Sequence, residues 1–169
     1  VANLTLGRKK YAGAEAAMLD LKREALALRG ELLALGRRDS EAFEAVLTAR
    51  RMPQSTPAEV VAREAAVAVA DLEACGVPLE TAQACVRVAE LAATAASQGN
   101  VNACSDAGVA GLLARAAGEG ALLNVQINLK SLAPSADRES VSLRRDTIRA
   151  SLLSASDRCA VAVQAAMNA

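Results

Sequence analysis

Apolar residues recur at alternating intervals of three and four along residues 18–49. Because this spacing places side chains on one face of a helix, it predicts a single long helix that packs into a bundle. One position of the stripe holds a carboxylate, Asp39. The apolar members of the stripe are Met18, Leu21, Ala25, Leu28, Leu32, Leu35, Ala42, Val46 and Ala49.

Two further stripes follow a proline-bracketed turn at residues 52–57 (MPQSTP). Thr56 and Glu59 have the spacing of a capping box, with Pro57 at the first helical position, so a helix is predicted to begin there. The segment 75–78 (CGVP) separates the two stripes and predicts a helix end followed by a restart. The stripes are Val61, Ala65, Ala68, Leu72 and Cys75, and then Leu79, Ala82, Val86, Ala89, Ala93 and Ala96.

The rest of the chain predicts two or three more helices. One begins near Asp106, and we expect Gly118 and Gly120 either to interrupt it or to allow close packing. Asp137 is expected to cap a final helix after a proline turn. The fold class is therefore all-α: an antiparallel bundle of five to six alanine-rich, close-packed helices, forming a single domain over residues 1–169.

Composition agrees with a helical fold and narrows the range of partners. Alanine is the most frequent residue, and its high helix propensity and small size favour closely packed helices. The 19 basic and 19 acidic residues balance, and one tyrosine and one phenylalanine are the only aromatic residues. A nucleic-acid partner is therefore not expected, because it needs a basic face and stacking platforms. No apolar run is long enough to predict a membrane span.

The four cysteines lack the spacing of a metal site. Cys75, Cys85, Cys104 and Cys159 form no CxxC pair, and the chain contains no histidine. We therefore expect no metal, and we expect reduced, packed thiols in a cytoplasmic protein.

Two asparagines stand one helical turn apart in the apolar segment 120–129 (GALLNVQINL). Asn124 and Asn128 are neighbours on a helix, and their amides offer directed donors and acceptors to a ligand. Alternatively, they are core amides that cap each other or a bend.

Two carboxylates are candidate proton acceptors, because without histidine proton transfer near neutral pH falls to other groups. Asp39 lies on an apolar stripe, where an unpaired carboxylate is costly; it is either functional or paired with Arg37, Arg38 or an arginine of a facing helix. Asp106 is either functional or a helix N-cap.

Six segments, in order, carry a family resemblance: LGRKKY, DSEAF, RRMPQSTP, QGNVNACSD, the following VAGLL, and GALLNVQINL. Together they resemble the cyclodeaminase domain of formiminotransferase-cyclodeaminase, whose family includes bacterial methenyltetrahydrofolate cyclohydrolases. Members usually carry a glycine-rich PGGGS opening ahead of the first helix, and this segment is expected to be missing before Val1.

The resemblance implies an enzyme that cyclises 5-formiminotetrahydrofolate to 5,10-methenyltetrahydrofolate with release of ammonia, as a homodimer or larger homo-oligomer. The alternatives are a methenyltetrahydrofolate cyclohydrolase acting at the same carbon and a non-catalytic helical binding protein. The substrate is a tetrahydrofolate derivative.

The expected mechanism assigns roles to the candidate residues. Asp39 or Asp106 takes a proton, while Asn124 and Asn128 hold the pterin or the tetrahedral centre. The basic pair 9–10, Lys9 and Lys10, meets the glutamate tail of the folate or donates to a nitrogen, or alternatively forms a solvated helix end. On an unbroken helix Asp106 and Asn124 stand about 27 Å apart. We therefore expect either a break at the glycines or, as we favour, a site shared between protomers.

Overall fold

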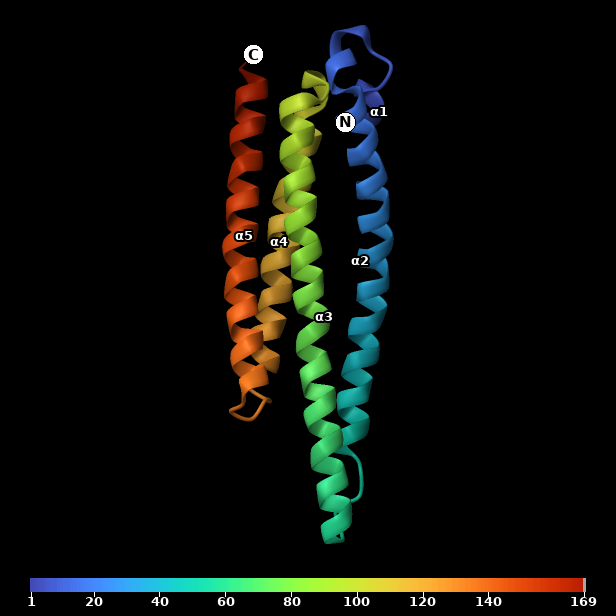
Figure 1. Ribbon diagram of the computed structural model, residues 1–169, viewed down its shortest axis with the longest axis vertical. Helices are drawn as coiled ribbons and strands as arrows, with labels where there is room; N and C mark the ends of the chain where they lie inside the picture. Colours follow the sequence, from blue (N-terminus) through green and yellow to red (C-terminus); the bar gives the residue numbers. More distant parts are fainter. Residues whose placement is uncertain (169) are drawn as a thin grey trace.

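The computed structural model describes residues 1–168 and contains only helices and their connections in that range (Figure 1). The predicted all-α antiparallel bundle is confirmed. Its helices are α1 (Ala2–Thr5), α2 (Glu15–Arg50), α3 (Pro57–Gln98), α4 (Cys104–Asn128) and α5 (Ala136–Met167), with 3-10 turns at Lys9–Ala14 and Val101–Ala103.

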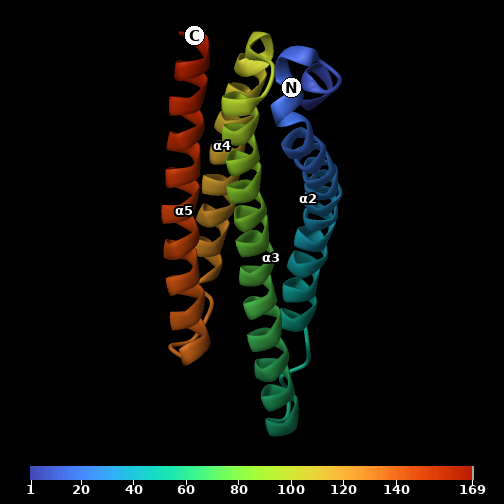
Figure 2. The same cartoon turned by 45° about the horizontal axis from the view of Figure 1, so that its top comes forward.

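Helix α3 is the central element of the bundle. It packs against α2 on one side and against α4 and α5 on the other, and α4 and α5 also pack together (Figures 1 and 2). The predicted stripe of α2 faces this packing, because Met18, Leu28 and Leu35 are buried. Asp39, on the same stripe, is exposed. Side chains of α2, α3 and α4 line two cavities between these helices.

One predicted cap is confirmed, and one is wrong. Thr56 Oγ1 accepts the Glu59 N–H at 3.3 Å, and the Glu59 carboxylate accepts the Thr56 N–H at 2.9 Å, which completes the capping box of α3. The cap of α5 is Ser135, whose side chain accepts the Arg138 N–H at 3.2 Å, and not Asp137. A cap must precede the first turn on extended backbone, and Asp137 already lies inside that turn.

The helix break predicted at residues 75–78 is also wrong, because α3 runs through Pro78 without interruption. Proline has no N–H, so the Ala74 carbonyl loses its partner within the helix. The side chain of Asn128, on α4, donates from Nδ2 to that carbonyl oxygen at 2.6 Å. A bond from a neighbouring helix thus replaces the missing intrahelical one, and Pro78 itself is buried.

Glycines on α4 allow close packing and do not break the helix. A Cβ atom on Gly118 would lie 2.6 Å from Cδ2 of Leu152 and 3.1 Å from Cβ of Cys85. Nothing lies within 4 Å of the corresponding point on Gly120. Gly118 is therefore needed for the contact of α4 with α3 and α5, whereas Gly120 is not.

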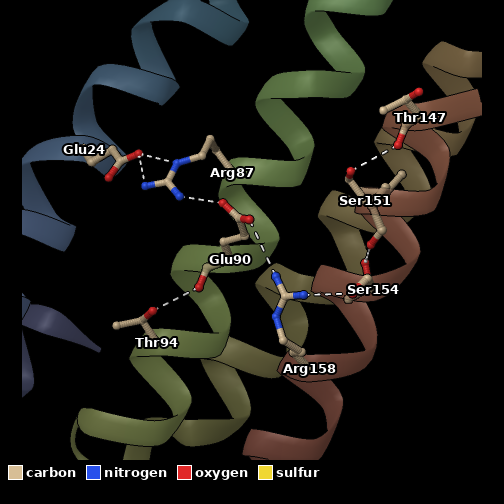
Figure 3. A network of polar contacts seen from close by, with 10 residues as sticks. Glu24, Arg87, Glu90, Thr94, Thr147, Ser151, Ser154 and Arg158 are labelled. Carbon is tan, nitrogen blue, oxygen red and sulfur yellow. Dashed lines mark hydrogen bonds and ion pairs between the residues drawn. The ribbon is translucent and has the colours of Figure 1, made fainter. Parts of the chain in front are cut away.

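A surface network connects three helices (Figure 3). Arg87 on α3 donates from Nε to Glu24 on α2 at 2.6 Å and also binds Glu90. Arg158 on α5 lies 3.6 Å from Glu90 and donates to Ser154. Such exposed pairs contribute little stability individually, so apolar burial along α3 dominates.

In the part of the chain that the structure describes, no helix combines the length and the apolar character that crossing a bilayer requires.

We predict that Gly118→Ala lowers the free energy of unfolding by about 1–3 kcal/mol, because the new methyl group would overlap Leu152 and Cys85. The matched control, Gly120→Ala, should raise stability by up to about 1 kcal/mol through helix propensity. Urea denaturation of both variants measures the difference. Equal effects at the two positions would show that close packing at Gly118 is not a constraint.

Candidate active site

A cavity of about 670 Å³ opens between α2, α3 and α4. Carboxylate, amide, hydroxyl, guanidinium and aromatic groups line it together with aliphatic side chains. Its polar and aromatic lining residues are Asp39, Ser40, Phe43, Glu44, Arg50, Asp71, Asn124, Asn128 and Ser131.

Three of the predicted site residues meet at this cavity: Asp39 from α2, and Asn124 and Asn128 from α4. Within residues 1–168 Asp39 forms no ion pair, so the alternative of a structural pair with a nearby arginine is not seen. Arg38 binds Glu80 and Glu73 on α3 instead. The carboxylate of Asp39 is exposed at the cavity and available to a ligand.

The two asparagines differ in their bonding. Asn128 has a structural partner, because its Nδ2 donates to the Ala74 carbonyl. That bond fixes the amide orientation, and Oδ1 remains available as an acceptor. The Asn124 side chain is exposed and forms no hydrogen bond within the described chain, so its whole amide is available. The alternative that the two amides cap each other is not seen.

An ion pair at the same cavity joins two residues outside the predicted site, Arg50 and Asp71. Asp71 on α3 is only 5% exposed, and Arg50 Nη2 lies 3.1 Å from its Oδ1. The same nitrogen donates to Ser131 Oγ at 3.2 Å. A sequence signal existed, because Asp71 lies three residues after Ala68 and four before Cys75, on the apolar stripe.

Phe43 is the second omission. It is the single phenylalanine of the chain, and it is 60% exposed at the cavity. An exposed aromatic ring offers a flat surface to a planar ligand. The motif DSEAF contains both Phe43 and Asp39, so the signal lay in a segment already singled out.

Asp106 lies elsewhere. It lines a separate, mainly apolar cavity of about 730 Å³ that α2, α3, α4 and the first residues of the chain form. Because α4 is unbroken, Asp106 and Asn124 stand about 27 Å apart in one chain. The alternative of a break at the glycines is therefore wrong, and a single protomer does not join Asp106 to the asparagines.

Lys9 and Lys10 also lie away from the asparagines. They begin the 3-10 turn before α2, where Lys10 Nζ is 5.5 Å from the centre of the Tyr11 ring. Tyr11 anchors this turn, because its hydroxyl accepts the Val101 N–H at 3.2 Å. The 36 residues of α2 span about 54 Å, so the two lysines and Arg50 lie at opposite ends of that helix.

Cys75, which follows the cavity residue Ala74 in the sequence, is unsuited to acid-base chemistry. Burial, with a smaller contribution from the charge of Asp71, raises the pKa of Cys75 to about 11. All four cysteines are free and buried. Among residues 1–168, no group of three or more potential ligands is arranged to hold a metal ion.

Comparison with known proteins identifies the family. A model of the formiminotransferase-cyclodeaminase family matches residues 1–150. The chain belongs to this family. The resemblance seen in the sequence motifs is thereby confirmed.

Two curated members of the formiminotransferase-cyclodeaminase family are similar over most of the chain. A methenyltetrahydrofolate cyclohydrolase from Methylorubrum extorquens is 42% identical over 132 residues, which cover 78% of this chain and 64% of that protein. A formimidoyltransferase-cyclodeaminase from Sus scrofa is 32% identical over 83% of this chain and 26% of that protein. The chain therefore spans less than two thirds of the length of either relative.

A solved structure within the formiminotransferase-cyclodeaminase family shares the fold. The crystal structure of formiminotetrahydrofolate cyclodeaminase from Thermotoga maritima has a TM-score of 0.86 and 27% sequence identity. The match covers 98% of this chain and 78% of that chain. The two proteins thus share the arrangement of helices that forms the cavity in this chain.

We predict that Asn128→Ala lowers the free energy of unfolding by about 1–3 kcal/mol, because it leaves the Ala74 carbonyl without a partner. In a Pro78→Ala background the restored N–H should bond that carbonyl, and the same change should then cost close to nothing. Urea denaturation of the four proteins gives the coupling. An equal cost in both backgrounds would show that Asn128 does not compensate for the proline.

Proposed function

We propose that the cavity between α2, α3 and α4 binds a tetrahydrofolate derivative and that the chain catalyses a reaction at the carbon between N5 and N10. The observation that carries the proposal is the meeting of Asp39, Asn124 and Asn128 at one cavity beside an exposed aromatic ring, Phe43. A carboxylate can move a proton, amides can hold a pterin, and the ring can pack on a planar group.

The reaction we put first is the opening of 5,10-methenyltetrahydrofolate by water. The relative with 42% identity has the name of a cyclohydrolase, and the relative with 32% identity has the name of a transferase-cyclodeaminase. This reverses the preference that we drew from the sequence motifs. Cyclodeamination of 5-formiminotetrahydrofolate is the second candidate, and the TM-score of 0.86 to a cyclodeaminase structure favours it.

In the proposed mechanism Asp39 acts as the general base. Water attacks the methenyl carbon, a C–O bond forms, and the Asp39 carboxylate accepts a proton from the water. The C–N5 bond then breaks, N5 takes a proton, and the hydroxyl proton leaves, so that a 10-formyl product and one net proton result. Asn124 and the free Oδ1 of Asn128 hold the pterin and the tetrahedral carbon in place.

Both candidate reactions use the same arrangement. In cyclodeamination N10 attacks the formimino carbon, Asp39 accepts the N10 proton, and the departing nitrogen is protonated and leaves as ammonia. The tetrahedral carbon occupies the same position in both cases. The choice between water and ammonia therefore does not change the residues assigned here.

We also propose that the chain works as a homodimer or larger assembly. Helix α4 exposes apolar side chains at intervals that match one helical face: Val109, Leu113, Leu123 and Ile127, each between 55% and 65% exposed. A second copy covering this face would reduce that exposure. A site shared in this way would bring Asp106 or the lysine pair 9–10 of one protomer to the cavity of another, but the mechanism proposed above does not require either.

The near-ultraviolet absorbance of the methenyl chromophore tests the proposed activity. The chain is offered 5,10-methenyltetrahydrofolate in one cuvette and 5-formiminotetrahydrofolate in the other. Accelerated loss of chromophore in the first identifies a cyclohydrolase, and its appearance in the second identifies a cyclodeaminase. No change above the uncatalysed rate in either would reject catalysis by this chain and favour the non-catalytic binding protein.

We predict that Asp39→Asn lowers kcat by about 10²- to 10⁴-fold with little change in stability, because the side chain is exposed and its carboxylate is the proposed base. Asp106→Asn is the matched comparison on the other cavity and should retain activity. Steady-state kinetics and circular dichroism of both variants separate chemistry from folding. Full activity in Asp39→Asn would reject Asp39 as the base, and a loss confined to Asp106→Asn would place the base in the second cavity.

A further inference from the structure

One end of the candidate cavity contains a guanidinium group that is held in place by a buried carboxylate. Asp71 is 6% exposed at its side chain, whereas that of Arg50 is 48% exposed. Arg50 is the last residue of α2, and Asp71 and Ser131 receive hydrogen bonds from a single nitrogen, Nη2. Nη2 is thus occupied, whereas the N–H groups of Nε and Nη1 have no partner within residues 1–168 and can each donate to a ligand.

A second cation lies at the same end of α2. Arg63 on α3 donates from Nε and Nη2 to the Arg50 carbonyl oxygen at 3.2 Å, which places its guanidinium group against the backbone of Arg50. The carboxylate of Glu59, one turn before Arg63, is engaged in the capping box. Two cations thus accompany one buried carboxylate, Asp71, at this end of α2, and the unpartnered N–H groups of Arg50 suit a second carboxylate. The other carboxylates that line the cavity, Asp39 and Glu44, lie eleven and six residues before Arg50 on α2.

Residues on one face of α2 line the cavity along its length and end at Arg50. Asp39, Phe43, Leu47 and Arg50 recur at intervals of four, four and three, and all line the cavity. Eleven residues separate Asp39 from Arg50, which corresponds to about 16 Å along the helix. A polar end, an aromatic and apolar middle and a cationic end therefore follow one another.

We propose that Arg50, held by Asp71, binds a carboxylate of the glutamate part of the folate, with the p-aminobenzoyl ring on Phe43 and Leu47 and the pterin near Asp39. This inference rests on the proposed function, because it fixes the orientation of the ligand in the same cavity. It assigns to Arg50 the contact that the sequence interpretation gave to Lys9 and Lys10, which lie at the other end of α2.

Two ligands that carry no one-carbon unit test the subsite without turnover: tetrahydrofolate and tetrahydropteroate, which lacks the glutamate. Dissociation constants are measured by anaerobic titration calorimetry. The wild-type chain should bind tetrahydrofolate about 10- to 100-fold more tightly than tetrahydropteroate. Arg50→Gln should abolish this preference and leave the affinity for tetrahydropteroate unchanged.

Matched variants keep the outcome interpretable. Arg23→Gln, which removes an exposed arginine of α2 outside the cavity, should retain the preference. Because Arg50→Gln leaves the buried Asp71 unpaired, the double variant Arg50→Gln/Asp71→Asn removes both charges and should show the same loss of preference in a folded protein.

The results separate this inference from the proposed function. A wild-type preference that survives in Arg50→Gln, the absence of any preference in the wild-type chain, or an equal loss for both ligands in the double variant would overturn the subsite. If the wild-type chain shows the preference and Arg50→Gln loses it, yet neither one-carbon substrate is converted, then the subsite stands and the catalytic proposal fails.

Discussion

The hydrogen bond from the Asn128 side chain to the Ala74 carbonyl is the interaction on which the central helix depends. Pro78 removes the partner of that carbonyl in the middle of α3, at Ala74, a residue that lines the cavity. The bond from α4 satisfies it, keeps α3 in one piece and joins the two helices at the wall of the cavity. The same bond fixes which atom of Asn128 a ligand can meet.

Small side chains set the remaining geometry. Glycine at position 118 allows α4 to lie close to α3 and α5, and α2 packs mainly against α3. Cavities therefore form between α2 and α4, and the central helix α3 supplies part of their lining. One of them is mainly apolar, and the other collects Asp39, Asn124 and the Arg50–Asp71 pair, which gives it the means to orient a ligand with distinct ends.

The sequence predicted those features that depend on neighbours along the chain. The stripe of α2 and the capping box at Thr56 follow from local spacing, and both are confirmed. The break predicted at Pro78 was wrong because the donor that compensates for it, Asn128, lies 54 residues along the chain from the Ala74 carbonyl. Periodicity shows that Asp39 lies on a face but not which helix it meets, so its position beside Asn124 required the structure. The same limit hid the pairing of Asp71.

A crystal structure of the chain with bound tetrahydrofolate tests the central claim most directly, because the claim concerns where and in which orientation the ligand lies. The account predicts the pterin beside Asp39 and Asn124, with the glutamate at Arg50. A ligand bound in the apolar cavity at Asp106, or one whose glutamate reaches the lysine pair 9–10 of the same chain, would contradict it.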